Sequence, residues 1–181
     1  LRLVGSVMCI RDRLYTAQLP DKGPFVIRYP RGRGVLADWH CELEEVKVGT
    51  GRKLHDGKDV AVLSFGPVGN NVEEAIEMME TSTPQLSIAH YDMRFAKPLD
   101  TEILKDVAQQ FDRIITIEDG AREGGFGSAV LEWLEDNGYR KNVVRLGLPD
   151  HFVEHGTVAE LQHIVGIDAE GIIDAVNDII K

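Results

Sequence analysis

Short apolar runs alternate with amphipathic segments of about 10–15 residues through most of the chain after residue 58. The run at 60–65 (VAVLSF) is almost continuously apolar, as expected for a strand that is buried on both faces. Similar runs follow at 86–91, 113–117 and 143–146. Such alternation is typical of βαβ units with right-handed crossovers. We therefore predict an α/β fold, a three-layer sandwich around a mostly parallel sheet.

Polar residues stand where the amphipathic segments begin. Asn70 or Asn71 precedes one helical pattern, Asp100 precedes the next, and Thr157 and Asp168 precede the two closing patterns. Side-chain oxygens at such positions accept hydrogen bonds from the free N–H groups of the first helical turn. We expect each of these residues to be a helix N-cap.

The rest of the chain divides into less regular parts. We assign residues 46–181 to the main domain, 35–45 to a linker and 14–34 to a leading fragment. Residues 1–13 fit no clear element, and a non-native origin for them stays open. The apolar run within them is too short for a signal peptide. A short strand is predicted at 46–48.

An arginine-rich stretch lies in the leading fragment. Residues 25–29 (FVIRY) favour a strand, and Pro30 with the following glycines ends it. Arg28, Arg31 and Arg33 would then lie near the carboxyl edge of a sheet, where ligands of α/β proteins usually bind. A guanidinium group can bond two oxygens of a phosphate or carboxylate. The alternative is a solvated basic turn, which the spacing alone favours.

Composition excludes several classes of protein. The chain has 181 residues, enough for one domain or one domain and a piece of another. Its 30 acidic and 20 basic residues give a net charge of −10, which argues against a nucleic-acid partner. No apolar run has the length of a membrane span, so no membrane partner is expected. Two cysteines form no disulfide framework, and a reducing compartment is the default.

A glycine-rich turn follows the run at 113–117. Residues 124–128 (GGFGS) could present free N–H groups to an anion at a helix N-terminus, but a tight turn that lets the helix pack closely is the preferred interpretation. The dinucleotide fingerprint and the P-loop lysine are absent. Glu118 and Asp119 could form an acid–base pair. Because adjacent strand residues face opposite sides, we favour surface carboxylates.

The histidines give no clear catalytic or metal set. His151 and His155 are four residues apart, but Pro149 and Gly156 indicate a loop, where that spacing does not bring two side chains together. We therefore predict no metal ligands. His90, near the end of a predicted strand, could be a base, but a packed core histidine is favoured. No catalytic serine or cysteine partner is found at a recognisable spacing, so we name no catalytic residue.

Several motifs together resemble one enzyme family. Their order and spacing resemble the C-terminal part of the 1-deoxy-D-xylulose-5-phosphate synthase family, over residues 14–181. The run at 92–100 is the most specific of them, and transketolases and the β subunits of 2-oxoacid dehydrogenases share a looser version. The motifs are 29–32 (YPRG), 63–66 (LSFG), 92–100 (DMRFAKPLD), 117–119 (IED) with 124–128 (GGFGS), 146–150 (LGLPD) and 166–172 (GIDAEGI).

This resemblance implies a thiamine-diphosphate-dependent transferase that joins pyruvate to glyceraldehyde 3-phosphate, with release of CO2. It implies that 46–181 is a transketolase C-terminal-like domain and that 14–34 is the end of the pyrimidine-binding domain. Arg31 matches the family arginine that binds the phosphate of the aldehyde substrate. The family motifs for thiamine diphosphate and Mg²⁺ are not in this sequence, so the resemblance implies no cofactor-binding, metal or catalytic residue here. A fragment of this kind is expected to be inactive alone.

The resemblance also implies a homodimer in the bacterial cytoplasm or, for a plant or alga, in the plastid stroma. Two alternatives stay open. The first is the β subunit of a thiamine-dependent 2-oxoacid dehydrogenase, against which the YPRG and DMRFAKPLD runs argue. The second is a stand-alone interaction module that keeps the transketolase-like fold without catalysis.

Overall fold

The protein was analysed as a computed structural model, which describes residues 7–29 and 42–181. Arg31 and Arg33 lie outside the described residues, as do most of the predicted linker and part of residues 1–13. Of the part of the chain that is described, no helix is both long enough and apolar enough to cross a membrane.

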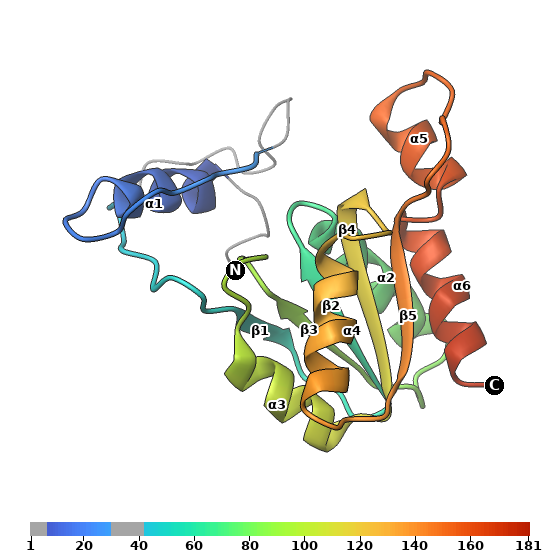
Figure 1. The fold of residues 1–181 in the computed structure, drawn as a ribbon. Coiled ribbons are helices and arrows are strands. Elements are labelled where there is room, and N and C mark those ends of the chain that lie inside the picture. The colour runs from blue at the N-terminus through green and yellow to red at the C-terminus, as the bar shows by residue number, and fades with distance from the viewer. Residues whose placement is uncertain (1–6, 30–41) are drawn as a thin grey trace.

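A five-stranded sheet with the order β1-β3-β2-β4-β5 forms the centre of the molecule (Figure 1). Its strands are β1 (Arg52–His55), β2 (Val60–Phe65), β3 (Ile88–Asp92), β4 (Arg113–Ala121) and β5 (Asn142–Leu148). The four strands from β2 onward pair in parallel, and β1 pairs antiparallel to β3 at the edge. The predicted mostly parallel sheet is therefore confirmed.

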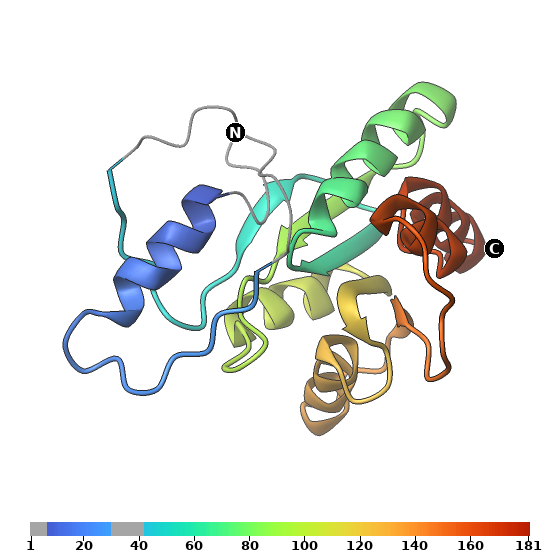
Figure 2. The same cartoon turned by 90° about the horizontal axis from the view of Figure 1, so that it is seen from above.

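Helices cover both faces of this sheet, as Figures 1 and 2 show. The helices α2 (Gly69–Ser82) and α6 (Ala169–Ile179) pack on one face. The helices α3 (Thr101–Gln110) and α4 (Phe126–Asp136) pack on the other. Helix α5 (Val158–Ile164) has no buried residue and projects from the sandwich. The three predicted layers are thus present.

Strand β2 shows why its sequence is apolar at nearly every position. Val60 and Val62 belong to the core beneath α2 and α6, whereas Ala61 and Leu63 belong to the core beneath α3 and α4. All four residues are fully buried. A central strand covered on both faces needs apolar side chains on both sides of the pleat.

Three of the predicted helix caps are confirmed. Asp100 accepts hydrogen bonds from backbone N–H groups in the first turn of α3. Thr157 forms a capping box with Glu160 at the start of α5, and Asp168 accepts a bond from the Gly171 N–H at the start of α6. Each cap satisfies backbone donors that a helix leaves free at its N-terminus.

The prediction that Asn70 or Asn71 caps α2 is wrong. The N-cap position is Val68, which makes no side-chain cap bond, and Asn70 and Asn71 lie inside the first turn. Asn71 instead donates from Nδ2 to the Ile167 carbonyl oxygen at 2.8 Å. The asparagine therefore joins α2 to the segment before α6, a long-range contact that the local sequence pattern does not encode.

Two predicted strands are not formed, and one strand was missed. Residues 25–29 have no regular secondary structure and pair with no described strand, and Val26 and Tyr29 are largely exposed. A strand is stable only when a neighbour takes up its backbone hydrogen bonds. Residues 46–48 are also irregular, whereas the polar segment of β1 forms the sheet edge against β3.

Helix α1 (Val7–Ala17) contacts the segment that enters the main domain. The Asp12 carboxylate accepts a hydrogen bond from the Glu44 N–H at 3.1 Å, and the Thr16 hydroxyl accepts one from the Val46 N–H at 2.8 Å. Asp12 and Thr16 are buried. Because α1 runs continuously through residue 13, no break in the backbone marks the predicted limit there, and the domain limits stay predictions.

Candidate functional site

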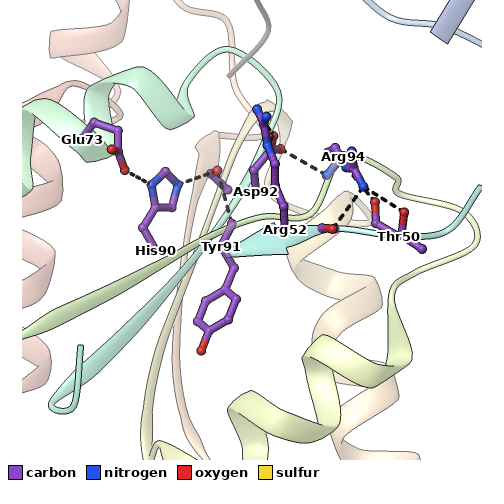
Figure 3. A network of polar contacts seen from close by, with 9 residues as sticks. Thr50, Arg52, Glu73, His90, Tyr91, Asp92 and Arg94 are labelled. Carbon is purple, nitrogen blue, oxygen red and sulfur yellow. Dashed lines mark hydrogen bonds and ion pairs between the residues drawn. The ribbon is translucent and has the colours of Figure 1, made fainter. Parts of the chain in front are cut away.

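The DMRFAKPLD run starts at the carboxyl end of β3, where Asp92 is almost completely buried. Arg52 of the neighbouring edge strand approaches the Asp92 Oδ2 atom with Nε and Nη2, each at 3.0 Å (Figure 3). The Arg94 backbone N–H donates to Asp92 Oδ1 at 3.2 Å. A buried carboxylate needs such partners to offset its lost hydration. Asp92 therefore fixes the edge strand and the turn after β3.

Arg94 holds the loop before β1. Its backbone has a positive φ of 54°, which turns the chain sharply after β3. Its Nε donates to the Thr50 carbonyl oxygen at 2.8 Å, and its Nη2 donates to Thr50 Oγ1 at 2.8 Å and to the Gly51 carbonyl oxygen at 3.1 Å. The N-cap residue Asp100 accepts a bond from the Gly51 N–H at 2.7 Å. The most specific motif in the sequence thus organises two loops at this end of the sheet.

His90 lies between a serine and a glutamate, and Figure 3 shows its contact with Glu73. Its Nε2 is 2.8 Å from Ser64 Oγ on β2, and its Nδ1 contacts Glu73 Oε1 on α2. Because an ionised carboxylate only accepts hydrogen bonds, Nδ1 carries the proton and, in the neutral ring, Nε2 accepts from the Ser64 hydroxyl. The hydrogen bond from His90 lowers the pKa of Glu73.

This arrangement has the connectivity of a hydrolase triad, but it is closed to substrate. Ser64 and His90 are both fully buried, so no electrophile reaches the serine oxygen. The prediction of a packed core histidine is therefore confirmed. Sequence analysis missed the partners of His90 because they come from β2 and α2 and are joined only by the fold.

The prediction that Glu118 and Asp119 are both surface carboxylates is wrong for Glu118. Only Asp119 is exposed, whereas Glu118 is 4% exposed and accepts a hydrogen bond from the Gly127 N–H at 2.9 Å. Gly127 lies in the first turn of α4, where free N–H groups and the helix dipole favour a negative charge. The anion at this helix N-terminus is thus the protein's own carboxylate.

The preferred interpretation of the glycine-rich turn is confirmed. A Cβ atom at Gly125 would lie 2.1 Å from the Ala121 carbonyl oxygen, and one at Gly127 would lie 2.5 Å from Thr116 Oγ1. No residue with a side chain fits these positions without a shift of its neighbours. The glycines allow α4 to pack directly against β4.

A cavity of about 510 Å³ lies at the carboxyl ends of β2 and β4. The stacked rings of Phe65 and Phe126, with centroids 5.4 Å apart, contribute to its wall. Cationic and acidic side chains also line it, and this is the edge where α/β sheets usually bind ligands. These charged residues are Arg13, Arg28, Arg94, Lys97, Glu118 and Asp119.

The segment of residues 25–29 forms another part of the cavity wall. Phe25 meets Phe95 edge to face, with ring centroids 6.2 Å apart. The Arg28 Nη2 atom donates a hydrogen bond to the Asp119 carbonyl oxygen at 2.8 Å. The segment is therefore attached to the loop after β3 and to the end of β4, although it joins no strand of the sheet.

Comparison with known proteins identifies the main domain. The model of the transketolase C-terminal domain family matches residues 49–172. The chain belongs to this family. The fold and the resemblance to which the sequence motifs pointed are thereby confirmed, and this transketolase C-terminal domain contains the whole five-stranded sheet.

Curated relatives extend the resemblance beyond this domain. The chain is 59% identical over 163 residues to a 1-deoxy-D-xylulose-5-phosphate synthase of Bacteroides thetaiotaomicron, which covers 90% of the chain and 25% of that protein. It is 52% identical over 171 residues to the synthase of Cytophaga hutchinsonii, covering 94% of the chain and 27% of that protein. The chain thus spans about a quarter of the length of these relatives.

Solved structures agree with the fold. A split-gene transketolase described as an inactive β4 tetramer has a TM-score of 0.68 and 32% identity, over 75% of this chain and 43% of the other. A transketolase variant of Pichia stipitis has a TM-score of 0.50 and 13% identity, over 72% of this chain and 18% of the other, which shows the fold alone.

One of the arginines that the sequence analysis singled out lies at the cavity. Arg28, which has no role in the family motif, lines it, while the structural position of Arg31 is outside the described residues. His151 and His155 are exposed in the loop between β5 and α5, as predicted. Arg94 also lines the cavity, although the sequence analysis did not name it as a site residue. Its position in the DMRFAKPLD run is the sequence signal that could have identified it.

A group of one histidine and two carboxylates lies at the junction of α5 and α6. The nitrogen and oxygen atoms of His163, Asp168 and Glu170 are within 4.8 Å of one another. His163 Nδ1 is 2.7 Å from Asp168 Oδ2, and the other Asp168 oxygen caps α6. The hydrogen bond that His163 donates to the Asp168 carboxylate raises the pKa of His163. Helix capping and this ion pair account for the group, so we assign no metal ligand to it.

The described residues that line the cavity do not provide a Mg²⁺ site. Mg²⁺ prefers oxygen ligands in octahedral geometry. Among the described lining residues the two carboxylates are Glu118 and Asp119, and Glu118 is already bonded to the α4 backbone. We therefore derive no thiamine diphosphate or Mg²⁺ site on the described residues.

Proposed function

We propose that the chain is the C-terminal part of a 1-deoxy-D-xylulose-5-phosphate synthase. The observation that carries the proposal is the 59% identity over 163 residues to a protein of that name. The full-length enzyme would be a thiamine-diphosphate-dependent transferase that also needs Mg²⁺. It would decarboxylate pyruvate and join the two-carbon unit to glyceraldehyde 3-phosphate, giving 1-deoxy-D-xylulose 5-phosphate and CO2.

Within that enzyme, this chain would provide structure and one substrate contact. Arg31 would bind the phosphate of glyceraldehyde 3-phosphate, because a guanidinium group can bond two phosphate oxygens. The cations that line the cavity at the ends of β2 and β4, Arg28, Arg94 and Lys97 among them, support an anionic substrate at this edge of the sheet. The domain would also pack beneath the pyrimidine-binding domain and contribute to a homodimer.

The chain alone would be inactive and would bind neither thiamine diphosphate nor Mg²⁺. The full-length enzyme would supply the first product of the non-mevalonate isoprenoid pathway, which is also used for thiamine and pyridoxal synthesis. The relatives are bacterial, which favours the bacterial cytoplasm over a plastid as the place of this reaction.

Two other functions are less well supported. The β subunit of a 2-oxoacid dehydrogenase would share the fold, but the curated relatives cited above are synthases that match 90–94% of the chain. A stand-alone interaction module would not need a substrate-binding arginine. The coding sequence upstream of Leu1 would distinguish these hypotheses. A diphosphate-binding motif in it is expected only if the chain belongs to the synthase.

The direct test is the reaction itself. The full-length protein that carries this sequence should form 1-deoxy-D-xylulose 5-phosphate from pyruvate and glyceraldehyde 3-phosphate. Arg31→Ala should raise the KM for glyceraldehyde 3-phosphate about ten- to hundredfold, the effect of losing a charge-assisted hydrogen bond, and should leave the KM for pyruvate nearly unchanged. An equal change in both KM values would refute the phosphate role of Arg31.

A further inference from the structure

Only one oxygen of the Glu118 carboxylate is used by the fold. Oε1 accepts the hydrogen bond from the Gly127 N–H at 2.9 Å, and the residue is 4% exposed. Oε2 has no hydrogen-bond partner among the residues that the structure describes. Because this atom is not enclosed by the protein either, it opens into the cavity that Glu118 lines. A carboxylate oxygen in such a position calls for a donor from outside the described chain.

Three glycines make room for this carboxylate. A Cβ atom at Gly125 would lie 2.5 Å from both Glu118 oxygens, and one at Gly120 would lie 3.0 Å from Oε2. A Cβ atom at Gly147, on β5, would lie 3.3 Å from Glu118 Cγ. The end of β4 is therefore shaped around a carboxylate of which the cap of α4 uses one oxygen alone.

A hydrogen-bond donor lies close to the free oxygen. Arg28 donates from Nη2 to the Asp119 carbonyl oxygen at 2.8 Å, which fixes its guanidinium group at the end of β4. The Gly120 Cβ position that is 3.0 Å from Glu118 Oε2 is also 3.3 Å from Arg28 Nη1, and the sum of these distances limits the gap between the two atoms. No direct bond joins these two described side chains. Two hydrogen bonds of about 2.8–3.0 Å that share one oxygen span a similar length.

We propose that Glu118 and Arg28 bind a hydroxyl group of the substrate. The hydroxyl donates to Glu118 Oε2 and accepts from Arg28 Nη1, so one group satisfies both side chains. A phosphate or carboxylate oxygen fits this position less well, because it cannot donate and it meets the negative charge of Glu118.

The inference deepens the proposed function and rests on it. Glyceraldehyde 3-phosphate has one hydroxyl group, on C2, between its aldehyde and the carbon that carries the phosphate. Pyruvate has no hydroxyl group. A site made of Glu118 and Arg28 would therefore recognise the aldehyde substrate and not the keto acid, while the cations that line the same cavity favour its phosphate.

The test uses the full-length enzyme and two aldehydes that differ by one hydroxyl group. These are 2-hydroxy-4-phosphonobutanal, a phosphonate analogue of glyceraldehyde 3-phosphate, and 4-phosphonobutanal, which lacks the hydroxyl. The wild type should prefer the hydroxylated aldehyde at least about tenfold in kcat/KM, because the other leaves a charged acceptor and a charged donor unpaired.

Glu118→Gln removes the acceptor and keeps the cap of α4. The glutamine carbonyl oxygen can still accept from the Gly127 N–H, but the amide NH₂ cannot accept the hydroxyl proton. The variant should lower kcat/KM for the hydroxylated aldehyde about tenfold and leave that for 4-phosphonobutanal within about twofold of the wild type.

Gly120→Ala tests the space between the two side chains. Its Cβ would lie between Oε2 and Nη1 with both groups still present, so it should reduce the same preference. Glu132→Gln is the matched control, because Glu132 is an exposed carboxylate of α4 that does not line the cavity. The control should keep the wild-type preference.

The possible results separate the two proposals. A wild type without a preference, or an equal change for both aldehydes in Glu118→Gln, would overturn the hydroxyl site and leave the proposed function standing. An equal loss together with a lower melting temperature would mean that Glu118 only caps α4, which also overturns the inference. If the wild type forms no product from pyruvate and glyceraldehyde 3-phosphate, the proposed function is wrong and the hydroxyl site fails with it.

Discussion

Arg52 binds the buried carboxylate of Asp92 through two nitrogens, Nε and Nη2, each 3.0 Å from the same oxygen, Oδ2. This ion pair joins the antiparallel edge strand β1 to the parallel body of the sheet, where Arg52 and Asp92 are register partners. Asp92 is 1% exposed, so its charge depends on the protein for its solvation. The stability of the sheet edge should therefore depend on this pair.

We predict that Arg52→Ala destabilises the protein by about 3 kcal/mol, because it leaves a buried carboxylate without its cation. Asp92→Asn should cost less, since the Arg52 side chain is 22% exposed and water can solvate part of its guanidinium group. Urea unfolding at pH 7, with an unchanged m-value, measures both differences. A smaller loss for Arg52→Ala than for Asp92→Asn would contradict this account.

The edge strand also shows what the sequence could and could not predict. The central strands were predictable because each is apolar over several residues and is followed by a helical pattern. Arg52–His55 has one apolar residue among four and becomes a strand only because β3 and Asp92 lie beside it. Residues 25–29 have strand propensity but pair with no described strand. Strand propensity alone does not provide a partner.

The candidate site was predictable only in part. The sequence suggested arginines that could bind an anionic ligand at a sheet edge, and the structure brings Arg28 and Arg94 to that edge. The contacts of Ser64 with His90 and of Arg28 with Asp119 join residues 26 and 91 positions apart. No periodic pattern encodes such contacts, because they depend on strand order and register.

We predict that Glu73→Gln is destabilising at neutral pH and nearly neutral in acid. The hydrogen bond from His90 keeps the pKa of Glu73 below its ordinary value of 4.5. A carboxylate with a lowered folded-state pKa contributes stability above its unfolded pKa and loses that contribution as the pH falls through the folded value. The free-energy difference between wild type and variant should therefore shrink as the pH falls below about 4.5.

Chemical denaturation between pH 7 and pH 3.5 measures this difference. Glu74→Gln is the matched control, since Glu74 is an exposed residue of the same helix and contacts no buried histidine. The control should show a small difference with little dependence on pH. A pH-independent cost for Glu73→Gln would argue against a charged hydrogen bond to His90.

Gly127→Ala should destabilise the protein by about 2 kcal/mol through overpacking between α4 and β4. The added Cβ would lie 2.5 Å from Thr116 Oγ1, inside any normal contact distance. Thr116→Ala removes that oxygen, so the double variant should lose less stability than the sum of the two single variants. Thermal unfolding of the four proteins gives the coupling energy, and additive losses would rule out the proposed clash.

The pKa of His163 should exceed its ordinary value of 6.5, because Nδ1 donates to the Asp168 carboxylate. A histidine with a raised folded-state pKa contributes stability below its unfolded pKa and loses it as the pH rises through the folded value. Asp168→Asn keeps an oxygen to cap α6 but removes the charge, so it should lower the pKa of His163. An NMR titration of the His163 ring in both proteins measures the change, and identical midpoints would exclude the ion pair in solution.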